Sequence, residues 1–134
     1  MLNYRVAAVR ADSHGSRAFA KSAEIVLDTD LAGREDAFNP VELMLAALAA
    51  CILKGIERVS PMINFDLDAV EVSLEAERQD NPPKVIRIRY DLAVRTGESE
   101  QRLELLHTNV RKYGTIFNTL SAATELSGTI RRLP

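Results

Sequence analysis

The side chain best suited to nucleophilic chemistry in this 134-residue chain is its single cysteine, Cys51. It lies within an apolar run at residues 43–53, in the middle of the expected helix. The helix dipole favours a thiolate only at the helix N-terminus, so it does not favour one at Cys51. Lys54 and Arg58 follow on the same helical face and are the only cations nearby in sequence. A lone cysteine among Ala and Leu is also typical of a small buried apolar side chain, so a catalytic and a structural role both stay open.

Four other side chains are candidates to assist Cys51. His107 would act as a base from a later helix, although its place at the edge of an apolar stripe favours a structural role. Arg17 and Arg34 are the guanidinium candidates near predicted loops, and each is also typical of a solvated surface arginine. Glu42 precedes Cys51 by nine residues, which places it on the opposite face of the helix, and it is better explained as part of the helix cap.

Composition excludes several classes of function. The net charge of -2 gives no electrostatic reason to expect a nucleic acid or an acidic membrane as partner. One cysteine and two histidines do not suffice for a Cys/His zinc site, and we expect neither a metal nor a cofactor. The longest apolar run is too short for the roughly 20 residues that span a bilayer. With its free cysteine, the chain is expected in the reducing cytoplasm.

The element that would position Cys51 is a helix predicted over residues 40–59. Asn39 can cap it, Pro40 suits the first helical position, and Glu42 can reach back to the cap. The Ser60-Pro61 pair is expected to end it. Upstream, the pattern predicts a hairpin of strands over 2–11 and 17–27, followed by a polar loop over 28–38.

Downstream of this helix the pattern predicts a second hairpin, with strands over 70–77 and 85–94 that turn at Pro82. The register implies the pairs Glu77 with Arg87, Glu75 with Arg89, and Leu74 with Tyr90.

A helix over 98–112, a short helix over 115–123 and a strand over 125–133 complete the chain. The buried stripe of the longer helix would be Leu103, Leu106 and Val110. The order β-β-α-β-β-α-β predicts one α+β domain covering residues 1–134.

The central helix is apolar on every side over residues 43–53, so it must be covered all round. One small sheet can cover only one face, and a second copy of the chain is the simplest cover for the other. Ala46, Ala47, Ala49 and Ala50 would let another backbone approach closely. We therefore expect a homodimer, with a helix enclosed inside one monomer as the alternative.

The stretch from Asn39-Pro40 through an Ala/Leu-rich helix to Cys51 resembles the signature of the OsmC/Ohr superfamily. The order of the later hairpin, helix and strand extends the resemblance over nearly the whole chain. It implies an OsmC-like α+β fold, with a long buried central helix and an intertwined homodimer whose sites lie at the subunit interface. It also implies a peroxiredoxin-like role in oxidative stress, because peroxidase members reduce organic hydroperoxides through their first cysteine.

Only part of the peroxidase set is present. Cys51 matches the first cysteine, and Arg17 is the nearest match to the arginine that comes from the first hairpin. Val41 stands where the peroxidases have a glutamate, and Gly114 stands where they have the second cysteine. The chain is therefore similar to the OsmC-like branch that lacks the second cysteine.

Two functions remain open, beside a third interpretation in which the dimer is a purely structural module. In the first, Cys51 is the nucleophile of a one-cysteine peroxide-reactive protein that depends on an external thiol reductant. In the second, the dimer is not an enzyme and binds a small apolar ligand at the subunit interface.

Overall fold

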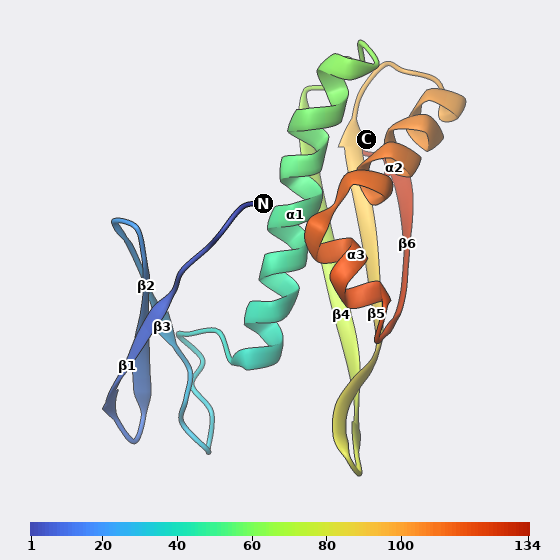
Figure 1. The fold of residues 1–134 in the computed structure, drawn as a ribbon. Coiled ribbons are helices and arrows are strands. Elements are labelled where there is room, and N and C mark those ends of the chain that lie inside the picture. Colours follow the sequence, from blue (N-terminus) through green and yellow to red (C-terminus); the bar gives the residue numbers. More distant parts are fainter. The chain divides into compact units, whose positions relative to one another are not determined.

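The computed structural model describes all residues from Met1 to Pro134. They form two compact units, Met1–Met44 and Leu45–Pro134, and each unit is described by itself. The helix α1 (Pro40–Met62) begins in the first unit and continues through the second (Figure 1). None of the helices combines the length and the apolar character needed to span a membrane.

The first unit holds an antiparallel sheet of three strands in the order β1-β2-β3. These are β1 (Ala7–Asp12), β2 (Gly15–Ala20) and β3 (Ala23–Leu27). The predicted single strand over 17–27 was wrong, because the chain turns back at Lys21, which adopts a positive φ of 55°. The first strand also begins later than expected, at Ala7.

The predicted cap of α1 is confirmed. The Asn39 side chain accepts a hydrogen bond of 2.9 Å from the backbone of Glu42, and the Glu42 carboxylate accepts one of 2.9 Å from the backbone of Asn39. The helix does not stop before Pro61 but runs to Met62. A proline in the last turn removes only one helical hydrogen bond, and the backbone of Ile63 still bonds the carbonyl of Val59.

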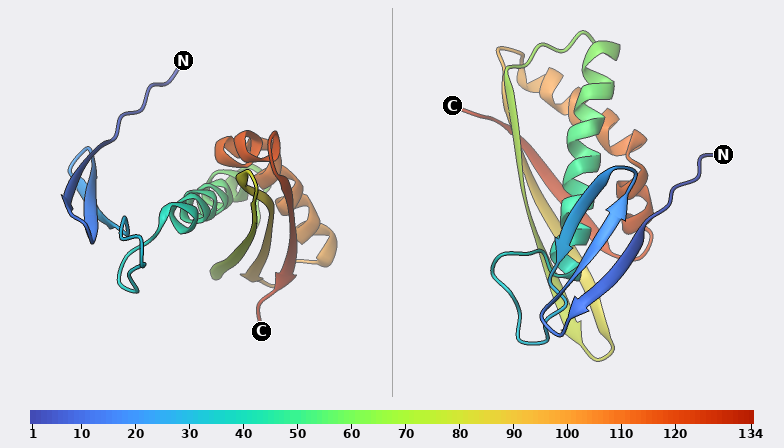
Figure 2. Two further views of the ribbon diagram at one scale, coloured as in Figure 1. Left: turned by 90° about the horizontal axis from the view of Figure 1, so that it is seen from below. Right: turned by 90° about the vertical axis from the view of Figure 1, so that its left-hand side faces the viewer.

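The second unit holds a sheet in the order β4-β5-β6, with the helices on one of its faces (Figures 1 and 2). Its strands are β4 (Ala69–Asp80), β5 (Pro83–Arg95) and β6 (Glu125–Arg132). Strands β4 and β5 pair antiparallel, whereas β5 and β6 pair parallel. The parallel pair requires a crossover, which α2 (Glu100–Tyr113) and α3 (Thr115–Ser121) supply.

The predicted register of the β4–β5 hairpin is confirmed: Glu77 pairs with Arg87, Glu75 with Arg89, and Leu74 with Tyr90.

The predicted apolar stripe of α2 is also confirmed, since Leu103, Leu106 and Val110 are all buried. With the extra strand and the separate α3, the element order is β-β-β-α-β-β-α-α-β, so the α+β class holds.

Helix α1 buries one face within the chain and leaves another open. Leu48, Ile52, Ile56 and Val59 are almost completely buried. Ala47, Ala50 and Leu53 are exposed. The sheet and helices of the second unit therefore do not cover this helix all round.

Candidate functional site

Cys51 lies partly buried on α1, with its sulfur against the junction of α2 and α3. A Cβ placed on Gly114, the residue at that junction, would be 3.2 Å from Cys51 Sγ. The same Cβ would be 3.0 Å from Phe117 Cβ and 3.3 Å from the carbonyl oxygen of Val110. A side chain at Gly114 would therefore crowd the cysteine sulfur, and glycine lets Cys51 pack directly against the junction.

Two glycines bring the helices close enough for this contact. Gly55, one turn after Cys51, is buried, and a Cβ there would be 3.2 Å from Val110 Cγ1. At the other end of the contact, Gly114 ends α2 with an extended backbone and begins α3. Larger residues at these positions would separate α1 from α2 and draw Cys51 away from the junction.

Arg111 adds a cation near this junction to the two that the sequence places on α1. Lys54 and Arg58 are exposed and enter no ion pair, so both are free to act on an anion that approaches α1. Arg111, which the sequence did not single out, lies with its guanidinium 5.5 Å from the centre of the Phe117 ring. The one available signal was its place in the last turn of α2, just before Gly114.

His107 is buried and bonded to another side chain. Its Nε2 lies 2.6 Å from the hydroxyl oxygen of Tyr90. Burial lowers the pKa of His107, and the positive charge of Arg111 lowers it further. Burial also raises the pKa of Tyr90 to about 12. The expectation of a structural rather than a basic role for His107 agrees with this pairing, because its Nε2 is already engaged.

The two arginine candidates belong to the first unit. Arg17 donates a hydrogen bond of 3.1 Å to Glu24 and lies 5.9 Å from the centre of the Phe19 ring. Arg34 makes two hydrogen bonds of 2.8 Å to the carboxylate of Asp36. Within one chain, each guanidinium therefore has a carboxylate partner of its own unit.

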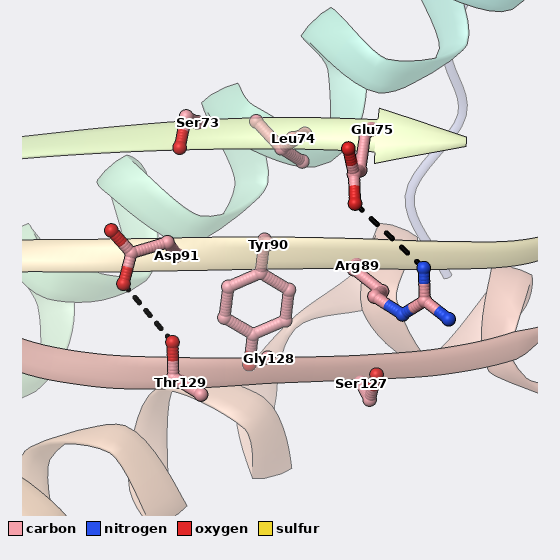
Figure 3. Close-up of a pocket in the computed structure, with 9 residues that line it drawn as sticks. All are labelled: Ser73, Leu74, Glu75, Arg89, Tyr90, Asp91, Ser127, Gly128 and Thr129. Carbon is pink, nitrogen blue, oxygen red and sulfur yellow. Dashed lines mark hydrogen bonds and ion pairs between the residues drawn. The ribbon is translucent and has the colours of Figure 1, made fainter.

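A separate pocket of about 480 Å³ lies along the three strands of the second unit (Figure 3). Its charged groups are paired: Arg89 lies 3.7 Å from Glu75, and Thr129 bonds Asp91 at 3.0 Å. It contains neither the cysteine nor a histidine. No cluster of His, Cys, Asp and Glu side chains in the chain could hold a metal ion. The junction at Cys51, rather than this pocket, is the candidate site.

The burial of His107 predicts an acid-dependent loss of stability. Its folded pKa is below the ordinary 6.5, so the unfolded chain takes up the proton first as pH falls. The stability contributed by neutral His107 is present above pH 6.5 and is lost as pH falls below it. We expect His107→Gln to flatten the pH dependence of the urea midpoint on the acid side.

His14 supplies the control, because its pKa shifts the other way. Asp30, 2.8 Å from its ring, raises the pKa of His14 above 6.5, so this pair stabilises the fold below pH 6.5 while Asp30 is ionised, and the contribution is lost as pH rises above 6.5. His14→Gln should therefore remove a loss of stability above pH 6.5 and leave the acid loss due to His107 in place. Equal pH profiles for the wild type and His107→Gln would contradict this account of the buried histidine.

Comparison with known proteins gives one family and many similar structures. The family model described as "OsmC-like protein" matches residues 33–127. No curated protein matches the sequence. An OsmC-like protein from Mycoplasma pneumoniae has a TM-score of 0.89 at 19% identity, with 99% of each chain covered.

Two further solved structures carry names that state a role. An organic hydroperoxide resistance protein from Legionella pneumophila has a TM-score of 0.71 at 18% identity, with 97% of this chain and 98% of that chain covered. The organic hydroperoxide resistance protein OhrB of Bacillus subtilis has a TM-score of 0.72 at 13% identity, with the same coverage. At such identities these similarities show the fold.

Proposed function

Because this chain belongs to the OsmC-like protein family, we propose that it is a one-cysteine, hydroperoxide-reactive protein of the oxidative stress response. Cys51 is the nucleophile, and an external thiol is the reductant. The observation that supports this most directly is that Cys51 Sγ packs against Gly114, the position where the resemblance places the second cysteine. The names of the hydroperoxide resistance proteins with this fold support the choice of substrate.

The chemistry requires a thiolate and two further thiols. The Cys51 thiolate attacks the outer oxygen of the hydroperoxide, so that an S–O bond forms, the O–O bond breaks and the alcohol leaves after protonation. An external thiol then displaces water from the sulfenic acid and forms a mixed disulfide. A second external thiol releases reduced Cys51 and an external disulfide. The chain has no other cysteine, so neither of these thiols comes from it.

We further propose that the active form is a homodimer in the cytoplasm. The exposed Ala47, Ala50 and Leu53 on α1 support a second copy as the cover of that helix. In such a dimer Arg17 is the guanidinium that polarises the peroxide at Cys51. Arg17 would have to leave Glu24 or share it to do so.

A second candidate function is the non-enzymatic binding of a small apolar ligand at the subunit interface. Val41 favours it, because an apolar residue stands where the resemblance implies a glutamate that orients the arginine. The Cys51 thiol also makes no hydrogen bond within the chain. This is expected of a side chain that only lines the apolar surface of a ligand-binding cavity.

The reaction of Cys51 with one equivalent of tert-butyl hydroperoxide separates the two functions. We expect mass spectrometry to find a sulfenic acid at Cys51 that a 1,3-diketone traps. Added monothiol should convert it to a mixed disulfide. Cys51→Ser should show neither product, and Arg17→Gln should form the sulfenic acid at least about tenfold more slowly, the loss typical of removing one electrostatic group.

Turnover with a dithiol should stay slow, since Val41 and Gly114 replace two groups of the peroxidase set. An unmodified Cys51 after peroxide treatment would remove the enzymatic proposal and leave ligand binding in its place.

A further inference from the structure

The ring of Phe117 is held from two sides beside the candidate site. The Tyr90 ring meets it edge-on at a centroid distance of 6.4 Å, and Arg111 lies 5.5 Å from its centre. The Phe117 Cβ and Cys51 Sγ both pack against Gly114, at 3.0 Å and 3.2 Å from the position that a Cβ would take there. Phe117 therefore forms part of the wall next to the cysteine sulfur, and whatever holds its ring controls that wall.

Tyr90 is itself fixed at both ends. Its ring lies over Gly128 on the neighbouring strand β6, so closely that a Cβ on Gly128 would overlap the ring (Figure 3). Its hydroxyl bonds His107 Nε2 at 2.6 Å, with the two rings edge-to-face. Tyr90 and His107 are only 4% and 5% exposed. A phenylalanine would fill the same space, so filling space does not explain the hydroxyl.

We propose that the Tyr90–His107 hydrogen bond positions Phe117 and thereby limits the access of reagents to Cys51. A continuous series of contacts carries the effect from His107 to Tyr90, Phe117, Gly114 and the sulfur. A buried hydrogen bond specifies one arrangement of side chains more sharply than apolar packing does. This inference depends on the proposed function only in taking Cys51 as the reacting residue.

The test measures the rate constant of Cys51 alkylation by iodoacetamide, which needs no peroxide chemistry. Tyr90→Phe and Phe117→Leu should each raise it about fivefold, since each frees the same wall. The double variant should react no faster than either single one, because both act through one series of contacts. Additive effects would mean that the two side chains act independently and would overturn the proposal.

Two controls separate positioning from a general loss of stability. Val94→Ala removes a buried side chain of β5 outside this series of contacts, so it should lower the urea midpoint without changing the rate constant. His107→Gln keeps a group that can accept the Tyr90 hydroxyl and should stay within about twofold of the wild type, whereas His107→Leu should match Tyr90→Phe.

Two outcomes decide against the proposal: a wild-type rate constant in both Tyr90→Phe and His107→Leu, or equal acceleration by Val94→Ala. If Tyr90→Phe does not fold, His107→Leu takes its place in the test. Its rate constant should then rise as much as that of Phe117→Leu, and an unchanged rate constant would contradict the proposal. If peroxide does not modify Cys51 but the alkylation rate constants change as expected, the proposed function is wrong and the positioning role of Tyr90 stands.

Discussion

Gly114→Cys is expected to form an intrachain disulfide with Cys51. In a disulfide, the Cβ of each cysteine lies about 3 Å from the sulfur of its partner. A Cβ on Gly114 would lie 3.2 Å from Cys51 Sγ, so the bond needs little movement. The bond would close a long loop between positions 51 and 114, and the chain-entropy model gives about 4 kcal/mol of stabilisation for such a loop.

Thiol titration and intact mass under oxidising conditions would detect this bond, and urea unfolding with and without reductant would measure its effect. Gly97→Cys is the matched control, because a Cβ there has nothing within 4 Å and its thiol should stay free. Two free thiols in oxidised Gly114→Cys would contradict the contact at the junction. A disulfide would show that a thiol at residue 114 reaches Cys51 within the chain, and an external reductant would then be needed only to reduce that disulfide.

Local patterns of sequence were sufficient to predict much of this fold. The cap of α1 depends on two side chains three residues apart, Asn39 and Glu42. The register of the β4–β5 hairpin follows from alternating apolar and charged residues and one turn at Pro82. In each case the interacting groups lie close in sequence or repeat with a fixed period, so the sequence pattern predicts the contact.

The errors came from structure without a strong local pattern. The turn at Lys21 contains neither glycine nor proline, so two strands looked like one. The extension of α1 through Pro61 depends on how little a proline costs in a last turn.

The surroundings of Cys51 were the least predictable part of the second unit. Gly114 came from a resemblance, and the structure then showed its contact with the sulfur. The pairing of Tyr90 with His107 joins β5 to α2, and the contact of Phe117 with Tyr90 joins α3 to β5. Such contacts depend on tertiary packing, which no spacing along the chain reveals.

Ala50→Asp is expected to abolish the folded dimer. Within one chain Ala50 is exposed, so in a monomer the new carboxylate would stay in water and change stability little. In a dimer that pairs the open faces of two α1 helices, the same carboxylate would be buried without a partner, once in each subunit. An uncompensated buried charge costs several kcal/mol, and the two charges would also repel each other. The size of the effect therefore reports directly on whether a second copy covers α1.

Sedimentation velocity at micromolar concentration, together with urea unfolding, would measure this outcome. The wild type should sediment as a dimer, and Ala50→Asp as an unfolded or monomeric chain. Ala123→Asp, at another exposed alanine outside α1, is the control and should remain dimeric with a nearly unchanged midpoint. A stable folded wild-type monomer, or an Ala50→Asp variant that sediments as a dimer, would exclude pairing of the two helices through this face. The exposed Ala47 and Leu53 would then need another cover, and the approach of Arg17 from a second chain would lose its support.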